Sequence, residues 1–351
     1  MNELTVVIPF LNEGQEVETT IQEIKRTAGD AVDIILVNDA SDDGFDYDAI
    51  AAKYHTEYIK HTQRQGSGPA KQAGINACRT PYFLVIDGHM RFYDNNWWIE
   101  IPKAIQSDPR AIYCCRCQSW DFDTKQEKTT KPPYGAYFQM LDSKNKKVLD
   151  VKWCKGAFNP EGDLKDIPCV LGACYAATKN YWNYLRGYDG LKLYSCEEAY
   201  ISMKAWMEGG RCRILCHVTI GHLFRKRFPY KVIATEYYYN KLLIAELLLP
   251  KEQRDIVIRA MKAANYVEYV RSRRQMEENK AEIDSLREDY SRILTAGYNR
   301  FDNINNRALA LYNNTTKTSS NKKTLSHEKN RTLSAVDPGS PDRSGAGATI
   351  H

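Results

Sequence analysis

An apolar run from Tyr82 to Ile86 stops abruptly at Asp87, Gly88 and His89. Its aromatic and β-branched side chains are typical of a buried strand. Asp87 and His89 are two positions apart, so in an extended segment both side chains point to the same side. A carboxylate and an imidazole placed in this way suit a divalent cation such as Mn2+, which can in turn hold a diphosphate. A strand that simply ends in a polar turn is the alternative interpretation.

The chain before this run alternates between strand and helix patterns. Apolar runs typical of strands cover residues 4–10, 32–37 and 58–61, whereas apolar residues at helical spacing cover 16–27 and a helix is expected over 66–78. This alternation predicts an α/β fold with a mainly parallel, twisted sheet flanked by helices.

Polar residues follow these strands at the places where ligands bind in such sheets. Asn12 and Glu13 follow the first strand, and Asp39 and Asp42 follow the second. Turn chemistry alone accounts for an acid-rich loop, but three strand ends that carry acids predict one shared crevice at the carboxyl edge of the sheet. Gly66 opens the next helix and can present backbone N–H groups to a phosphate there.

Two later segments carry further candidate groups. Glu197 and Glu198 stand where a helix begins, a position at which the helix dipole favours acids. A general base or a clamp for sugar hydroxyls is the functional alternative. His222 is a candidate third metal ligand, and Arg225 beside it is well suited to a diphosphate.

Taken in order, these segments resemble nucleotide-sugar glycosyltransferases of the GT-A fold, and most closely the polypeptide N-acetylgalactosaminyltransferases and their bacterial family 2 relatives. The resemblance extends over roughly residues 4–230. The matching residues are 7–13, 37–43, 87–89, 197 with 201–202, and 221–227. No single segment is specific, but the ordered set is.

The resemblance implies a role for each matching residue. The donor nucleotide would lie against Phe10 and Asn12, with Asp39 reading the uracil, and the strand-end residues Glu13, Asp42 and Gly66 are further candidates for this pocket. Mn2+, or Mg2+ in its place, would be held by Asp87, His89 and His222 against the diphosphate of a UDP-sugar. Glu197 would contact the sugar hydroxyls and Arg225 would neutralise the departing UDP.

Glu198 departs from the pattern of the polypeptide-modifying enzymes, which retain the anomeric configuration and carry an amide at this position. Inverting family 2 enzymes carry an acid there that deprotonates the acceptor. Glu198 is therefore either a catalytic base or a bystander, and the stereochemistry stays open.

The C-terminal part of the chain changes character. We expect a catalytic domain over residues 1–232, a helical region over 233–312 and a disordered tail over 313–351. The charged helical pattern after residue 250 predicts a solvated or coiled helical appendage, with a surface for nucleic acid or a partner as the alternative.

Composition narrows the class of protein. The chain has 351 residues and a net charge of +5, which by itself does not argue for nucleic acid. Its ten cysteines are irregularly spaced, which predicts free thiols in a reduced compartment. Because neither an apolar leader nor a run of about 18 apolar residues is present, we expect no transmembrane segment and a cytoplasmic location.

The sequence thus predicts a metal-dependent glycosyltransferase that moves a sugar of the GalNAc, GlcNAc or Glc class from a UDP-sugar to a hydroxyl on a protein or glycan. A hydroxylated base in DNA is an alternative acceptor. A non-catalytic scaffold that binds a sugar nucleotide is the alternative from another class, and a Rossmann dehydrogenase is disfavoured because the Gly-x-Gly-x-x-Gly fingerprint is missing. Donor sugar, acceptor and oligomeric state are not determined.

Overall fold

The structure, a computed structural model, describes residues 2–142, 147–154 and 164–311. Its strands are β1 (Leu4–Phe10), β2 (Asp33–Asn38), β3 (Glu57–Lys60), β4 (Tyr82–Ile86), β5 (Met90–Phe92), β6 (Ala111–Asp121), β7 (Ala136–Asp142), β8 (Lys147–Trp153), β9 (Leu164–Asp166), β10 (Cys174–Thr178) and β11 (Arg211–Phe224). Its helices are α1 (Glu16–Ala28), α2 (Tyr47–Tyr54), α3 (Ser67–Ala77), α4 (Trp97–Ser107), α5 (Lys179–Tyr184), α6 (Glu197–Glu208), α7 (Ala234–Leu248), α8 (Lys251–Ala264), α9 (Tyr266–Glu278) and α10 (Lys280–Ile293), and residues 298–311 are also helical.

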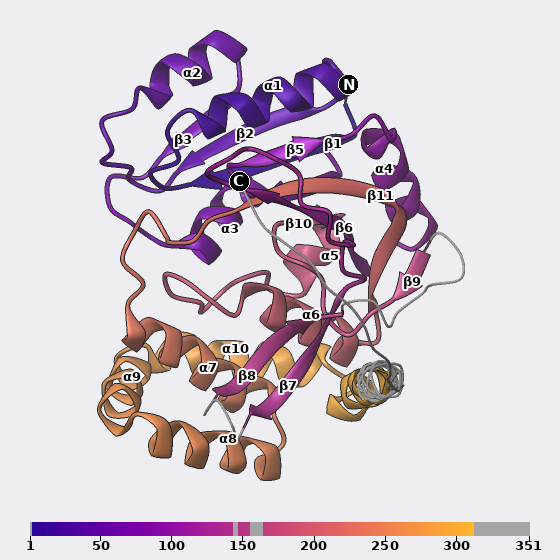
Figure 1. Ribbon diagram of the computed structural model, residues 1–351. Coiled ribbons are helices and arrows are strands. Elements are labelled where there is room, and N and C mark those ends of the chain that lie inside the picture. Colours follow the sequence, from indigo (N-terminus) through magenta and orange to yellow (C-terminus); the bar gives the residue numbers. More distant parts are fainter. Residues whose placement is uncertain (1, 143–146, 155–163, 312–351) are drawn as a thin grey trace, which may run out of the picture.

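The central sheet has the strand order β3-β2-β1-β4-β10-β6-β11-β5, and β9 pairs with β11 (Figure 1). The four strands β3, β2, β1 and β4 run parallel, as the strand–helix alternation predicted. β10 lies antiparallel between β4 and β6, and β11 runs parallel to β6. The expected α/β sheet flanked by helices is confirmed, although its second half is more mixed than the sequence indicated.

Side chains alternate between two apolar cores, one on each face of the sheet. Phe83 and Val85 of β4 belong to the core covered by α3 and α6, whereas Leu84 and Ile86 belong to the core covered by α1 and α4. Successive side chains of a strand point to opposite faces, so a strand buried on both faces needs the continuous apolar run seen here. Figure 1 shows α1 and α2 on the side of the sheet opposite α6.

The C-terminal helices are present as expected, but the prediction that they form a solvated appendage is wrong for their inner faces. Met276 of α9 and Leu286 and Tyr290 of α10 are buried in the same core as Tyr200 of α6. The hydroxyls of Tyr200 and Tyr290 lie 2.7 Å apart. Charged residues from the outer faces alternate with these apolar residues along the chain, so the sequence pattern suggested helices exposed to solvent on all sides. The tail expected to be disordered, residues 313–351, lies outside the described residues.

The apolar run over residues 169–177 is a strand only from Cys174 onward, because the chain before it turns irregularly past α6. One further prediction, an extended segment at Asp87 and His89, differs from the structure. The segment from Asp87 to His89 is a bend between β4 and β5 rather than a continuous strand. Thr20 of α1 holds this bend, since its hydroxyl donates to the carbonyl of Gly88 and accepts from the backbone N–H of Met90.

The ten cysteines are free thiols, and most of them are buried. Among the helices of the described ranges, none is both long enough and apolar enough to cross a membrane.

Candidate functional site

A cavity of about 460 Å³ opens at the carboxyl ends of β1, β2 and β4. The sheet therefore places its ligand site where parallel α/β sheets usually have one. Ten of the predicted residues line it: Phe10, Glu13, Asp39, Gly66, Asp87, His89, Glu197, Glu198, His222 and Arg225.

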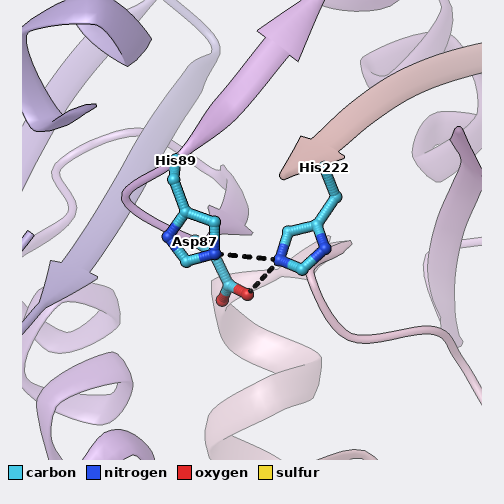
Figure 2. A group of neighbouring side chains, drawn as sticks. All are labelled: Asp87, His89 and His222. Carbon is cyan, nitrogen blue, oxygen red and sulfur yellow. Dashed lines mark hydrogen bonds and ion pairs between the residues drawn. The ribbon is translucent and has the colours of Figure 1, made fainter. Parts of the chain in front are cut away.

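Three predicted metal ligands converge at one side of this cavity (Figure 2). Asp87 and His89 come from the bend after β4, and His222 comes from β11, more than 130 positions later. Nε2 of His222 lies 3.1 Å from Oδ2 of Asp87 and 3.1 Å from Nε2 of His89. One ligand atom from each residue lies within 4.8 Å of the others.

This donor set fits a divalent cation. Ligand atoms about 2.1 Å from an ion and at right angles to each other lie about 3 Å apart, close to both separations seen here. Imidazole nitrogens bind first-row divalent ions and a carboxylate suits Mn2+, so two histidines and one aspartate can hold such an ion. Nδ1 of His222 is buried and has no hydrogen-bond partner among the described residues.

The charges of the cluster also suit metal binding. Burial acts to raise the pKa of Asp87, but the hydrogen bond with His222 and the positive charge of Lys71 outweigh it, so the pKa lies below its ordinary value. Burial and the neighbouring His89 lower the pKa of His222. The carboxylate is thus ionised and the imidazole neutral near pH 7, which are the forms that bind metals.

Glu13 lies behind the cluster and joins it to Arg225. Oε2 of Glu13 is 2.9 Å from Nδ1 of His89 and also accepts a hydrogen bond from the Arg225 guanidinium. The guanidinium lies over the ring of Phe122, 4.2 Å from its centroid. Such outer carboxylates fix the tautomer and orientation of a ligating histidine. Glu13, a predicted residue of the donor pocket, lines the cavity and contacts His89 and Arg225 there.

Asp39 is almost fully buried at the end of β2. Its Oδ2 accepts from the backbone N–H of Gly66 at 2.7 Å, and its Oδ1 accepts from the backbone N–H of Gln65 at 2.8 Å. Nδ1 of His61 lies 2.9 Å from Oδ1. These bonds hold the start of α3 against the end of β2, and the predicted contact of Asp39 with uracil would use its remaining acceptor capacity.

Two predicted residues do not line the cavity. Asn12 and Asp42 form a reciprocal pair, in which Nδ2 of Asn12 donates to Oδ1 of Asp42 at 2.7 Å and Oδ1 of Asn12 accepts from the backbone N–H of Asp42 at 2.8 Å. The left-handed backbone of Asn12, with φ of 57°, accompanies this pairing between the two loops. In this structure both residues thus pair with each other beside the cavity, and their predicted contact with the donor stays a prediction.

The acids at the start of α6 face a buried lysine. Nζ of Lys71, on α3, lies 3.5 Å from Oε1 of Glu198. Oε1 of Glu197 is buried without a hydrogen-bond partner among the described residues, and burial together with the charge of Glu198 raises the pKa of Glu197 against the opposing effect of Lys71. An unpartnered buried acceptor at a cavity is costly unless a ligand satisfies it.

Sequence reasoning missed several residues of the cavity wall, namely Arg64, Lys71, Trp153, Tyr194 and Tyr230. Only Lys71 left a signal: it is a lone charge among small residues at a helical position between buried neighbours. The others come from loops and from the β7–β8 hairpin. Local sequence patterns do not predict how these segments pack onto the sheet. Arg64 donates to the carbonyl of Lys231 and lies over the ring of Tyr230.

Comparison with known proteins agrees with this architecture. Residues 5–162 match the family described as Glycosyl transferase family 2. Polypeptide N-acetylgalactosaminyltransferase 11 of Xenopus tropicalis is 26% identical over 241 residues, which cover 64% of this chain and 39% of that protein. The chain spans about two fifths of the length of the curated relatives it matches.

Two solved structures share the fold. The crystal structure of GalNAc-T7 with UDP, GalNAc and Mn2+ superposes with a TM-score of 0.69 at 16% identity and covers 86% of this chain and 56% of that one. The structure of S. aureus TarS 1-349 in complex with UDP-GlcNAc gives a TM-score of 0.51 at 13% identity and covers 89% and 88%. Residues 5–162 therefore match the Glycosyl transferase family 2 model, and the described part of the chain has the GT-A fold.

Proposed function

We propose that this chain is a metal-dependent glycosyltransferase that transfers a hexose or N-acetylhexosamine from a UDP-sugar to an acceptor hydroxyl. One observation carries the proposal: Oδ2 of Asp87, Nε2 of His89 and Nε2 of His222 meet in a cavity that also holds Arg225 and two acids of α6. Two findings support the proposal. The name of the curated relative specifies N-acetylgalactosamine transfer. The two solved structures of the same fold hold UDP, GalNAc and Mn2+ in one case and UDP-GlcNAc in the other.

The proposed donor site divides into three parts. The nucleotide would lie over Phe10 and Asp39, and its diphosphate would lie between the metal ligands and Arg225. A bound divalent cation would offset the charge that develops on the departing diphosphate. The guanidinium of Arg225 can add bidentate hydrogen bonds to the same oxygens.

The sugar would lie toward α6. The free Oε1 of Glu197 can accept a hydrogen bond from a sugar hydroxyl. Glu198 is the proposed base that removes the proton from the acceptor hydroxyl as its oxygen attacks the anomeric carbon and UDP leaves. Nζ of Lys71 lies 3.5 Å from Oε1 of Glu198, so a buried cation stands beside the proposed base.

The proposed acceptor is a hydroxyl on a protein or a glycan. The case for DNA depended on the basic helical segment after residue 250, but many of its arginines are paired within the helices. Arg273 bonds Glu246, Arg271 bonds Glu268 and Arg274 bonds Glu278. These pairs account for much of the basic character that suggested nucleic acid.

The experiment that tests the function is release of UDP from a panel of UDP-sugars, with Mn2+ and with EDTA. We expect turnover of one donor with Mn2+, loss of turnover with EDTA, and loss in Asp87→Ala and in His222→Ala. His217→Ala is the matched control, because His217 lies on the same strand and pairs with Glu100 away from the cavity. If the unaltered protein shows no turnover and also does not bind UDP, that result would contradict the proposal and favour a scaffold.

A further inference from the structure

The turn that leads into α6 has an unusual backbone. Leu193, Ser195 and Cys196 all have positive φ angles, of 40°, 95° and 70°. Residues with a Cβ atom rarely adopt this left-handed region because of steric strain. Such strain persists only where surrounding contacts hold it in place, and it tends to occur at functional sites. Cys196 is the N-cap of α6 and makes no side-chain capping bond.

A single side chain from a distant helix makes the polar contacts that hold this turn. Asn240 of α7 is almost completely buried. Its Oδ1 accepts from the backbone N–H of Lys192 at 2.9 Å. Its Nδ2 donates to the carbonyls of Lys192 at 2.7 Å, Ser195 at 3.0 Å and Tyr194 at 3.2 Å. Among the described residues, the hydrogen bonds of this side chain thus all go to the turn.

The turn over residues 192–196 contacts or continues into three parts of the cavity wall. Leu193 forms a parallel bridge with Gly66, the residue whose N–H bonds Asp39. The ring of Tyr194 lines the cavity. Glu197, with its unpartnered Oε1, begins α6 directly after Cys196. A shift of the turn would therefore move the proposed sugar-binding acid and the wall beside the nucleotide together.

We propose that Asn240 is a positioning residue for the donor sugar: it holds residues 192–196 in a strained conformation that fixes Glu197 and Glu198 relative to the metal ligands. This inference rests on the proposed transferase function. It also gives α7 a part in the active site through this side chain, and the neighbouring Lys241 donates to the carbonyl of Val148 in β8, a strand whose Val151 and Trp153 line the cavity.

The test compares two buried asparagines. Asn305 is equally buried, lies in the helix over 298–311 and likewise bonds both backbone groups of one residue, Phe138. Asn240→Ala and Asn305→Ala thus both remove a buried amide, but only the first releases the turn. We expect Asn240→Ala to lower kcat for UDP release from the UDP-sugar by roughly tenfold to a hundredfold, the scale on which misplaced reacting groups cost rate. UDP affinity, measured by calorimetry, should change far less, and Asn305→Ala should leave kcat unchanged.

A rescue separates positioning from packing. In the Asn240→Ala background, Ser195→Gly with Cys196→Gly removes the steric penalty of the left-handed backbone, so kcat should recover in part. Amide hydrogen exchange supplies a readout that does not depend on turnover: exchange at residues 193–197 should increase in Asn240→Ala and not in Asn305→Ala. Asn240→Ser, which keeps one hydrogen-bonding group, replaces the alanine variant if that variant does not fold.

The outcomes are distinct. If the unaltered protein turns over a UDP-sugar but Asn240→Ala matches Asn305→Ala in kcat and in exchange at the turn, the positioning role is wrong and the function stands. Equal losses in kcat and UDP affinity without rescue by glycine also contradict it, because they indicate a general packing role. If the unaltered protein neither turns over a donor nor binds UDP, the transferase proposal and this inference fail together.

Discussion

Oε2 of Glu13 lies 2.9 Å from Nδ1 of His89, on the side of the ring that faces away from the metal cluster. Because a carboxylate only accepts, this contact places a proton on Nδ1 and leaves the lone pair of Nε2 directed at Asp87 and His222. The same oxygen of Glu13 accepts from Arg225. One carboxylate thus orients both the proposed metal ligand and the proposed diphosphate-binding cation.

The first prediction follows from this arrangement. Glu13→Gln removes the negative charge that His89 and Arg225 share, and a neutral amide oxygen is a weaker acceptor for these two donors than a carboxylate. We expect Mn2+ affinity to fall by about 10- to 100-fold, the usual cost of losing such an outer partner. Calorimetric titration with Mn2+ in the absence of nucleotide measures it.

Asp42→Asn is the control for this variant. It makes the equivalent acid-to-amide change in a neighbouring strand-end loop, but Asp42 pairs with Asn12 away from the cavity wall. Mn2+ affinity should be unaltered. Equal losses in the two variants would show that the effect is one of loop charge and not of His89 orientation.

The predicted fold was largely correct because strands and helices follow from local periodicity. The continuous apolar run from Phe83 to Ile86 predicts a strand that is buried on both faces. The carboxyl ends of parallel strands lie at the same edge of the sheet. That is why Asp39, Asp87 and His89 could be assigned to one crevice from the sequence, which also offered His222, a residue of β11, as a candidate third metal ligand.

Contacts that depend on loop conformation could not be predicted. Asn12 was expected in the nucleotide pocket, but its left-handed backbone accompanies a pairing with Asp42. Lys71 and Asn240 act across distances of more than 40 residues in sequence, where no periodicity relates one partner to the other. The domain limits, the cytoplasmic location and the roles of the site residues stay predictions.

The second prediction concerns the buried cation at α6. Lys71→Met removes the positive charge 3.5 Å from Glu198 and near Glu197. Loss of a neighbouring cation raises carboxyl pKa values, and burial already raises that of Glu197. If an ionised carboxylate acts as the base, the acidic limb of the pH–rate profile for UDP release should move to higher pH. Lys71→Arg keeps the charge and should leave that limb in place; a profile that is the same in both variants would contradict the pairing.

The third prediction tests Glu198 without replacing it. A Cβ atom at residue 172 would lie 2.4 Å from Oε1 of Glu198, so Gly172→Ala must push the carboxylate aside. The obstructed group is the end of a flexible side chain, so we expect the unfolding midpoint to change little. Turnover should fall about 100-fold or more, as in Glu198→Gln, because general base catalysis contributes on this scale.

Product stereochemistry completes this test. A base at Glu198 predicts inversion at the anomeric carbon, which proton NMR of the product reads directly. Retention, together with normal turnover in Gly172→Ala, would show that Glu198 is not the catalytic base. Glu197 would then be the acid of α6 that contacts the donor.

The fourth prediction compares two glycines with positive φ angles. Gly66 has φ of 101°, and a Cβ atom there would lie 2.0 Å from Cα of Leu193, a backbone atom that cannot swing away. Gly44 has φ of 75° and nothing within 4 Å of the same position. Gly44→Ala should therefore lower the free energy of unfolding by about 1 kcal/mol, the cost of the backbone conformation alone. Gly66→Ala adds an overlap that costs about 1 to 3 kcal/mol more. It also separates the strained turn from the start of α3, so UDP affinity should fall as well.

Equilibrium denaturation of both variants under one set of conditions measures the difference in the free energy of unfolding. Equal losses in the two variants would mean that Leu193 does not pack against Gly66 as described.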